Sequence, residues 1–274
     1  MRILVTGADG QLGSEFLKIK SDHDFYGFNK QSLDITNLEM IKECFDKVQP
    51  ELVINCAAYT NVDGCESNQD MAYEINAKGV GLLAGECIKK NCALVHISTD
   101  YVFDGKKGRE YFEFDTTNPL CVYGKSKLAG EEIIKTIMKK FYIVRTSWLY
   151  GKGKNFVKTM LELSKTRDSL EVVNDQFGSP TYARDMAEAV VDLISTQEYG
   201  IYHITNSGYC SWYELACKIF DINNIKTDVV PIDTQKLNRP AKRPAFSVLG
   251  NSKLKYKLRY WEEALKEYLA NTQF

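Results

Sequence analysis

The segment that most constrains the fold is "VTGADGQLG", which runs from Val5 to Gly13 near the start of the chain. It follows "RILVT" (residues 2–6), a short apolar run typical of a buried strand. Gly7 permits a tight turn, Gly10 lets a pyrophosphate approach the backbone, and Gly13 lets the next helix pack closely. The free N–H groups and positive dipole end of that helix also favour phosphate. The position of this turn predicts dinucleotide binding, although a purely structural glycine turn is the alternative.

The rest of the first half alternates between apolar runs and helical patterns. Predicted strands cover residues 2–6, 25–28, 52–58, 93–99 and 141–146, and predicted helices cover about 11–20, 37–48, 70–90 and 122–140. Strands separated by helices of this length form βαβ units with right-handed crossovers. The sequence therefore predicts an α/β, Rossmann-like, doubly wound parallel sheet with helices on both faces.

After residue 147 the alternation loosens. Further helices are predicted at about 155–166, 184–195, 212–220 and 262–270, with one more sheet strand at 201–205. We expect residues 1–147 to form an NAD(P)-binding Rossmann domain, to which the chain returns near 175–205. Residues 148–274 are expected to form mainly a smaller, discontinuous substrate-binding lobe.

Composition excludes several classes of function. Lys plus Arg is 35 and Asp plus Glu is 36, without a basic block, so nucleic acid is not an expected partner. No apolar run reaches the roughly 18 residues of a membrane span. The eight cysteines form no CxxC pair, which favours reduced thiols in a cytoplasmic protein over a zinc site or disulfides. We expect no metal site, and we expect His96 and His203 to be satisfied histidines of the core.

The end of the second predicted strand bears on the choice of cofactor. Many NAD-binding folds place an acid there, but this chain has Asn29 and Lys30. Lys30 could pair with a 2′-phosphate, or it could be an ordinary solvated lysine. NADPH is therefore the expected cofactor, with NADH tolerated. Asp34 and Ile35 could lie at the adenine, or Asp34 could cap the next helix, a role that Asn37 could also fill.

Three side chains could carry proton chemistry. Thr99 and Asp100 follow a buried strand, at the edge where doubly wound sheets place ligand groups. Tyr123 precedes Lys127 by four residues, so the two share one face of a helix. A nearby ammonium and a positive nicotinamide would lower the high pKa of the phenol, and the Thr99 hydroxyl could bind a substrate carbonyl. Lys125 is expected to be a surface lysine.

These motifs, in this order, resemble the extended short-chain dehydrogenases/reductases, and most closely the dTDP-4-dehydrorhamnose reductase family. The resemblance covers residues 1 to about 205 and extends to near 249. The segments that carry it are "VTGADGQLG", "NCAAYTNVDGCE", "INA", "HISTDYVFDG", "NPLCVYGKSKLAGE", "RTSWLYG", "NFVKTML", "NDQFGSPT", "IYHI" and "RPAFSVL".

The resemblance implies roles for matching residues. In the matching motifs the cofactor would be held by Gly10, Gln11, Leu12, Asp34, Ile35, Ala57, Ala58, Tyr59, Thr60, Tyr123 and Lys127. The arguments on the turn and on the second strand add Gly7, Gly13, Asn29 and Lys30, and Asn29 is where the chain departs from relatives that have an acid. Thr99, Tyr123 and Lys127 would be catalytic, with Tyr123 as the proton donor. The nucleotide sugar would contact Thr99, Asp100, Trp148 and Asn155. Apart from the resemblance, Arg243 in a Pro-bounded loop could bind the diphosphate, which needs a cationic partner. Trp148 could instead be plain core, and Arg243 could be an ordinary surface charge.

The implied activity is reduction of the C4 keto group of dTDP-4-dehydro-β-L-rhamnose by NAD(P)H, for surface polysaccharide synthesis. Related 4,6-dehydratases have an Asp-Glu pair after the threonine, whereas this chain reads Thr99, Asp100, Tyr101. One proton donor suffices for ketone reduction. The alternatives are a reductase or epimerase of another nucleotide sugar, and a non-catalytic NADP-binding regulatory subunit. The partner is expected to be a small nucleotide sugar, and a homodimer is compatible with the sequence.

Overall fold

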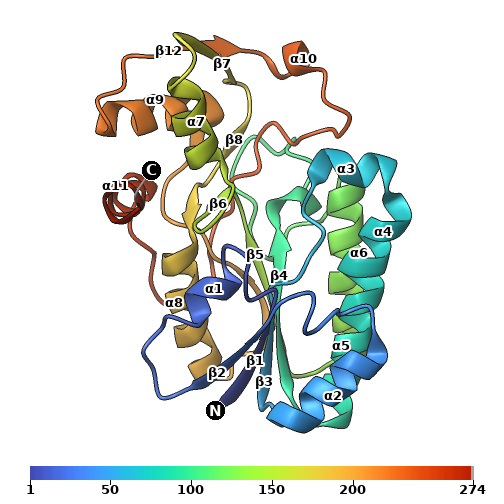
Figure 1. The fold of residues 1–274 in the computed structure, drawn as a ribbon. Helices are drawn as coiled ribbons and strands as arrows, with labels where there is room; N and C mark the ends of the chain where they lie inside the picture. The colour runs from blue at the N-terminus through green and yellow to red at the C-terminus, as the bar shows by residue number, and fades with distance from the viewer. Residues whose placement is uncertain (273–274) are drawn as a thin grey trace.

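The computed structural model describes residues 1–272, and a six-stranded sheet lies at its centre (Figure 1). The strands are β1 (Arg2–Thr6), β2 (Asp24–Phe28), β3 (Leu52–Asn55), β4 (Ala93–Thr99), β5 (Phe141–Thr146) and β10 (Gly200–His203). They stand in the order β2-β1-β3-β4-β5-β10, and every neighbouring pair is parallel. The predicted doubly wound parallel sheet is confirmed. Its strand order reverses between β1 and β3, where such folds bind ligands.

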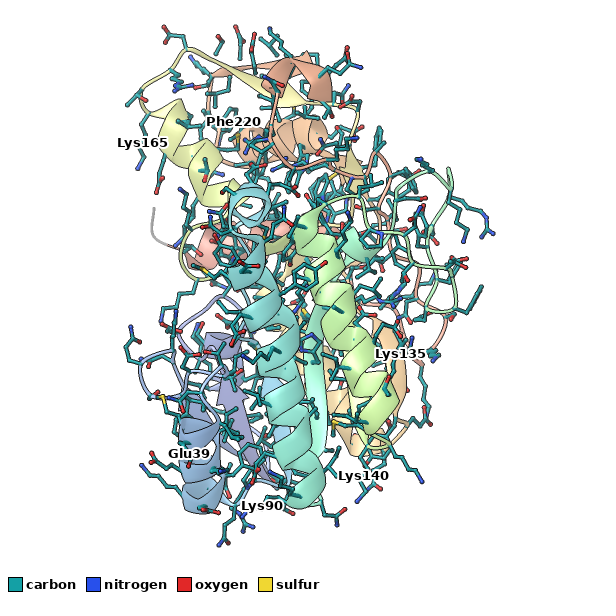
Figure 2. All side chains as sticks on the ribbon, turned by 90° about the vertical axis from the view of Figure 1, so that its right-hand side faces the viewer. Glu39, Lys90, Lys135, Lys140, Lys165 and Phe220 are labelled. Atoms are coloured by element: carbon teal, nitrogen blue, oxygen red, sulfur yellow. The ribbon has the colours of Figure 1, made fainter. Side chains whose placement is uncertain are left out.

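The sheet has an apolar layer on each face. Ile3 and Val5 point to a core shared with α1 and α8, whereas Leu4 points to a core shared with α2, α5 and α6. All three side chains are fully buried, and each such burial contributes about 1.5–3 kcal/mol. Figure 1 shows the two helical layers on opposite sides of the sheet, and Figure 2 faces the layer that contains α5 and α6. The helices are α1 (Gly13–Phe16), α2 (Leu38–Val48), α5 (Val80–Lys89), α6 (Val122–Ile137) and α8 (Ala183–Thr196).

The helix predicted at residues 70–90 is divided. It consists of α4 (Gln69–Tyr73), a π-helical segment η1 (Glu74–Gly79) and α5, and a short α3 (Val62–Ser67) precedes it. Within η1, the buried Asn76 amide accepts a hydrogen bond from Tyr59 N at 2.8 Å and donates to Ser126 Oγ at 3.0 Å. Asn76 therefore ties the segment after β3 to α6. Such π turns are often found at functional sites.

A second core lies beyond the carboxyl ends of the strands. It contains α7 (Phe156–Ser164), α9 (Trp212–Ile222), α11 (Trp261–Asn271), β7 (Ser169–Val173) and β12 (Asp228–Ile232). The sequence did not predict the β7–β12 pair, because β12 is short, largely exposed and contains Pro231. In contrast, α8 and β10 return to the main sheet.

Smaller elements complete the described chain. They are η2 (Asp100–Val102), β6 (Leu149–Tyr150), β8 (Phe177–Gly178), β9 (Thr181–Tyr182), β11 (Cys210–Ser211) and α10 (Thr234–Leu237). Within residues 1–272, no helix combines the length and apolar character needed to cross a bilayer. All eight cysteines are free thiols, and most are buried.

Candidate active site

A cavity of about 850 Å³ opens at the carboxyl ends of the sheet strands, next to the point where the strand order reverses. It brings together most of the side chains singled out in the sequence. These are Gly7, Gly10, Gln11, Leu12, Gly13, Lys30, Asp34, Ile35, Ala57, Ala58, Tyr59, Thr60, Thr99, Asp100, Tyr123, Lys127 and Trp148. Asn29, Asn155 and Arg243 are not among the lining residues.

The glycine turn forms one end of this cavity. Gly7 has a φ of +61°, and a Cβ on it would lie 2.9 Å from Ala57 N. A Cβ on Gly13 would lie only 2.2 Å from Gly7 O, so the turn and the first helix are too close for any side chain there. The Gln11 Oε1 atom is buried without a hydrogen-bond partner. The turn therefore has the close backbone approach and the spare polar group that a dinucleotide phosphate would use.

The end of the cavity where the sequence predicts adenosine to bind differs from the prediction at Asn29. Lys30 and Asp34 line the cavity, but Asn29 does not; its Oδ1 accepts hydrogen bonds from Ser32 N and Oγ, both at 3.0 Å. Asn37, rather than Asp34, caps α2. Burial alone would raise the pKa of Asp34, but Thr36 and the charge of Lys30 hold it below its ordinary value. Asp34 therefore remains ionised beside a cation.

Thr99 and Asp100 form a buried pair at the end of β4. Thr99 Oγ1 donates to Asp100 Oδ1 at 3.0 Å and accepts from Tyr101 N at 3.2 Å. Ser247 Oγ donates to the other carboxylate oxygen at 2.5 Å. Burial raises the pKa of Asp100 to about 6, although both hydroxyl groups oppose this shift. Two hydrogen bonds therefore fix the orientation of the Thr99 hydroxyl group at the cavity wall.

Tyr123 and Lys127 both line the cavity, one turn apart on α6. Burial raises the pKa of the Tyr123 phenol above its ordinary value, although the nearby Thr99 hydroxyl works against this shift. Burial also lowers the pKa of Lys127 to about 8. The sequence argument expected the lysine to lower the pKa of the phenol. In the protein without ligand the larger effect is desolvation, so the resting phenol is protonated.

Lys127 has definite partners inside the protein. Its Nζ donates to Ile97 O at 2.6 Å and lies 3.3 Å from His96 Nε2. His96 is fully buried, as is His203, whose Nδ1 lies 2.9 Å from Gly250 O. Both histidines have hydrogen-bond partners, as the sequence predicted for core histidines.

Two stacked tryptophans line another part of the cavity. Trp148 stacks on Trp212 with ring centroids 3.5 Å apart and planes 7° apart. Trp148 has a φ of +46°, an uncommon conformation for a bulky residue, so packing must hold it there. A Cβ on Gly178 would lie 2.5 Å from the Trp148 indole, so Gly178 leaves the space that the ring occupies.

Two predicted substrate contacts lie elsewhere. Asn155 caps α7, and its amide donates to Gly151 O at 2.8 Å and to Tyr268 at 3.1 Å. Arg243 forms an ion pair with Asp63 at 2.9 Å. Arg239 shares that carboxylate at 3.1 Å. The Asn155 amide therefore stabilises the start of α7, and the Arg243 guanidinium is paired with Asp63 of α3.

The sequence argument missed Trp212 and Ser247, which come from distant parts of the chain. No local signal could have found Ser247, because its role is visible only through its contact with Asp100. Trp212 opens a predicted helix, and an aromatic residue at a helix start usually belongs to the core. Among the described residues, no group of three or more His, Cys, Asp or Glu side chains is placed to hold a metal ion.

The strand order, the glycine turn and the Thr99, Tyr123, Lys127 constellation define a class of protein: a dinucleotide-binding oxidoreductase of the extended short-chain dehydrogenase/reductase type. The comparison with known families agrees. Residues 1–274 match the family described as "RmlD substrate binding domain", and the chain belongs to that family.

Three similar proteins show how far the likeness extends. A spore coat polysaccharide biosynthesis protein of Bacillus subtilis, SpsK, is 44% identical over 274 residues, which cover 98% of this chain and 96% of that protein. A dTDP-4-dehydrorhamnose reductase structure from Clostridium acetobutylicum is 47% identical with a TM-score of 0.96, covering 98% of this chain and 99% of that one. A dTDP-4-dehydrorhamnose reductase from Bacillus anthracis, solved in complex with NADP, is 43% identical with a TM-score of 0.96, covering 99% of both chains.

Proposed function

We propose that this protein reduces the C4 keto group of dTDP-4-dehydro-β-L-rhamnose, giving dTDP-L-rhamnose for surface polysaccharide synthesis. The observation that carries the proposal is the meeting of the glycine turn, Thr99, Tyr123 and Lys127 in one cavity. The high identity to named dTDP-4-dehydrorhamnose reductases over nearly the full chain supports the choice of substrate. The absence of a glutamate after Asp100 favours reduction over elimination of water.

Thr99 and Tyr123 have different roles in the proposed reduction. A bound nicotinamide in its reduced form supplies the hydride. When the substrate binds, the Thr99 hydroxyl would turn its proton from Asp100 to the substrate carbonyl oxygen. Together with the Tyr123 phenol it would then stabilise the charge that develops on that oxygen. Tyr123 then transfers its proton to that oxygen, which leaves the carbon reduced and the oxygen neutral. Because burial keeps the phenol protonated before the reaction, the acid is in the form that the step requires.

NADPH is the preferred cofactor in this proposal, with NADH tolerated. Lys30 supports it, since this exposed lysine lines the adenosine end of the cavity and no acid stands at the end of β2. Lys30→Met is expected to weaken NADPH binding about three- to tenfold, as for one partly exposed ion pair, and to leave NADH binding unchanged. Fluorescence titration with each nucleotide measures the effect. An equal loss for both nucleotides would argue that Lys30 does not contact a 2′-phosphate.

The direct test follows NADPH oxidation at 340 nm with the purified protein and dTDP-4-dehydro-β-L-rhamnose. We expect turnover with that ketosugar to exceed turnover with UDP-linked 4-ketosugars. Binding of NADPH without oxidation in the presence of any of these ketosugars would favour the regulatory-subunit alternative. Faster turnover with another nucleotide sugar would retain the reductase and replace its substrate.

The proposal also covers the cellular location and the oligomeric state of the protein. We place the protein in the cytoplasm, which the free, mostly buried thiols support because thiols stay reduced there. A homodimer remains part of the proposal, and sedimentation equilibrium of the purified protein tests it.

A further inference from the structure

A row of polar side chains crosses three neighbouring strands beneath Lys127. Thr6, Asn55 and His96 stand in register on β1, β3 and β4, so they lie side by side on one face of the sheet. All three are essentially fully buried. They occupy the ligand-facing end of the otherwise apolar face that packs against α2, α5 and α6. The proposed reaction gives none of them a role, and buried polar groups of this kind need a reason.

Hydrogen-bond contacts join the row in sequence, from Thr6 through Asn55 and His96 to Lys127. Thr6 Oγ1 lies 2.6 Å from Asn55 Oδ1, and Ala57 N donates to the same oxygen at 3.2 Å. Asn55 Nδ2 lies 3.1 Å from His96 Nδ1. On the other side of the ring, His96 Nε2 lies 3.3 Å from Lys127 Nζ.

The orientation of the Asn55 amide decides which nitrogen of the His96 ring carries the proton. The backbone N–H of Ala57 can only donate, and it lies 3.2 Å from both Asn55 Oδ1 and Thr6 Oγ1, so an amide oxygen fits this position. The 2.6 Å separation from Thr6 Oγ1 also suits an O–H···O bond and is shorter than N–H···O bonds usually are. The Asn55 amide N–H therefore points at His96 Nδ1, which must accept. A neutral imidazole that accepts at Nδ1 carries its proton at Nε2.

We propose that His96 is a positioning residue for Lys127: Asn55 fixes the Nε2–H tautomer of its ring, and that N–H points at Lys127 Nζ and lowers the proton affinity of the lysine. A donor aimed at an amine favours the neutral amine, which has a lone pair, over the ammonium, which has none. The Ile97 carbonyl accepts a proton of the amine at 2.6 Å and fixes its position.

The other titratable groups around Lys127 are either neutral or already paired, so they do not offset the effect of His96 on the proton affinity of the lysine. Glu131 lies one turn further along α6, but Arg145 on β5 pairs with its carboxylate at 2.6 Å, and Ser98 donates to it as well. Cys56, after β3, is a thiol whose pKa burial raises, so it stays neutral. Tyr123, one turn before Lys127, is a neutral phenol. The lowered pKa of Lys127, near 8, and the lowered pKa of His96 agree with a lysine of reduced proton affinity beside a neutral imidazole.

Nuclear magnetic resonance of the cofactor-free protein with ¹⁵N-labelled histidine tests the tautomer directly. The chain has three histidines, and loss of one set of signals in His96→Gln assigns the ring. We expect a pyridine-like Nδ1 and a pyrrole-like Nε2 for His96 at neutral pH. The opposite pattern, or two pyrrole-like nitrogens, would overturn the proposal. This inference rests on the placement of Lys127 in the proposed active site, but the spectrum needs no turnover, so a failed reductase assay would leave its result standing.

Two variants test whether Asn55 fixes the His96 tautomer and whether His96 lowers the proton affinity of Lys127. In Asn55→Asp the carboxylate would accept from the ring, so the proton should move to Nδ1; an unchanged tautomer would show that Asn55 does not fix it. In His96→Phe the loss of a donor should raise the titration midpoint of Lys127 by about one unit, followed by ¹³Cε resonances of labelled lysine. A fall, as expected if the ring accepts from an ammonium, would refute the proposal. Lys125, exposed on the same helix, is the control, because His96→Phe should leave its ¹³Cε resonance unchanged.

Discussion

At the scale of single residues, Tyr123 and Lys127 show how burial changes the chemistry of ordinary side chains. Both lie in the same cavity, and desolvation shifts both pKa values towards the neutral forms. A neutral phenol is a proton donor, whereas a neutral amine is a poor electrostatic partner for a phenolate. A bound nicotinamide in its oxidised form would add the positive charge that the cavity itself supplies only weakly.

Removal of the Tyr123 hydroxyl is the first prediction at this scale. Tyr123→Phe keeps the ring and its edge contact with Tyr101, 5.5 Å between centroids, but has no proton to give. We expect kcat to fall about 10²- to 10⁴-fold while the Kd for NADPH stays within about twofold. Stopped-flow absorbance and fluorescence titration measure the two quantities. Lys125→Met, on the exposed part of the same helix, should keep full turnover; a Tyr123→Phe protein that also does so would exclude the phenol as the acid.

The second prediction concerns Asp100 and pH. Its pKa of about 6 in the folded protein exceeds the ordinary value of 3.8, so its protonated form is stabilised by folding. The resulting stability is present below about pH 4 and is lost as the pH rises through 6. Asp100→Asn should remove this loss, which totals on the order of 3 kcal/mol for a shift of this size, about 2 kcal/mol of it between pH 4.5 and 7.5. Urea unfolding of both proteins at pH 4.5 and 7.5 checks it, and an identical pH dependence in the two proteins would count against the assignment.

At the scale of elements, the glycine turn depends on two close approaches of backbone. Gly7 must adopt a positive φ, and Gly13 must pass the Gly7 carbonyl oxygen without a Cβ. The first helix is accordingly shorter than predicted, at Gly13–Phe16 rather than about residues 11–20. Periodicity could not reveal this, because Leu12 and Phe16 fit a longer helix equally well.

Gly13→Ala and Gly85→Ala form a matched pair of glycine substitutions. A Cβ at Gly13 would lie 2.2 Å from Gly7 O, whereas a Cβ at Gly85, inside α5, meets nothing within 4 Å. Gly13→Ala should therefore lower stability by about 2–4 kcal/mol and NADPH affinity at least tenfold. Gly85→Ala should be neutral or stabilising by up to about 1 kcal/mol. Thermal unfolding and nucleotide titration measure both, and similar behaviour of the two variants would contradict the packing argument.

At the scale of the whole molecule, the cavity lies where the main sheet meets the second core. The sheet supplies the glycine turn and Thr99, α6 on its face supplies Tyr123 and Lys127, and α9 of the second core supplies Trp212. Trp148, just after β5, stacks on Trp212 across this junction. The tryptophan wall of the cavity therefore exists only when both parts are folded together.

Truncation of Trp212 tests this arrangement. Trp212→Ala removes the ring that supports Trp148, so the KM for the nucleotide sugar should rise about tenfold or more, while the Kd for NADPH changes less than about twofold. Trp212→Phe retains an aromatic surface and should show an intermediate KM. Steady-state kinetics and nucleotide titration measure both constants. Loss of NADPH affinity without a change in the KM for the sugar would place Trp212 on the cofactor side instead.

The sequence by itself determined the parallel sheet, the position of the glycine turn and the strand-end and helix residues gathered in the cavity. These features depend on short-range patterns, since period-2 and period-3.6 hydrophobicity and turn glycines are local properties. Only the tertiary structure decided that the Asn155 amide donates to Tyr268, that Arg243 pairs with Asp63, and that Trp212 enters the cavity. It also decided that His96 lies between Asn55 and Lys127. Such contacts join residues tens of positions apart, and a pKa depends on the burial that those contacts create, so no local pattern encodes them.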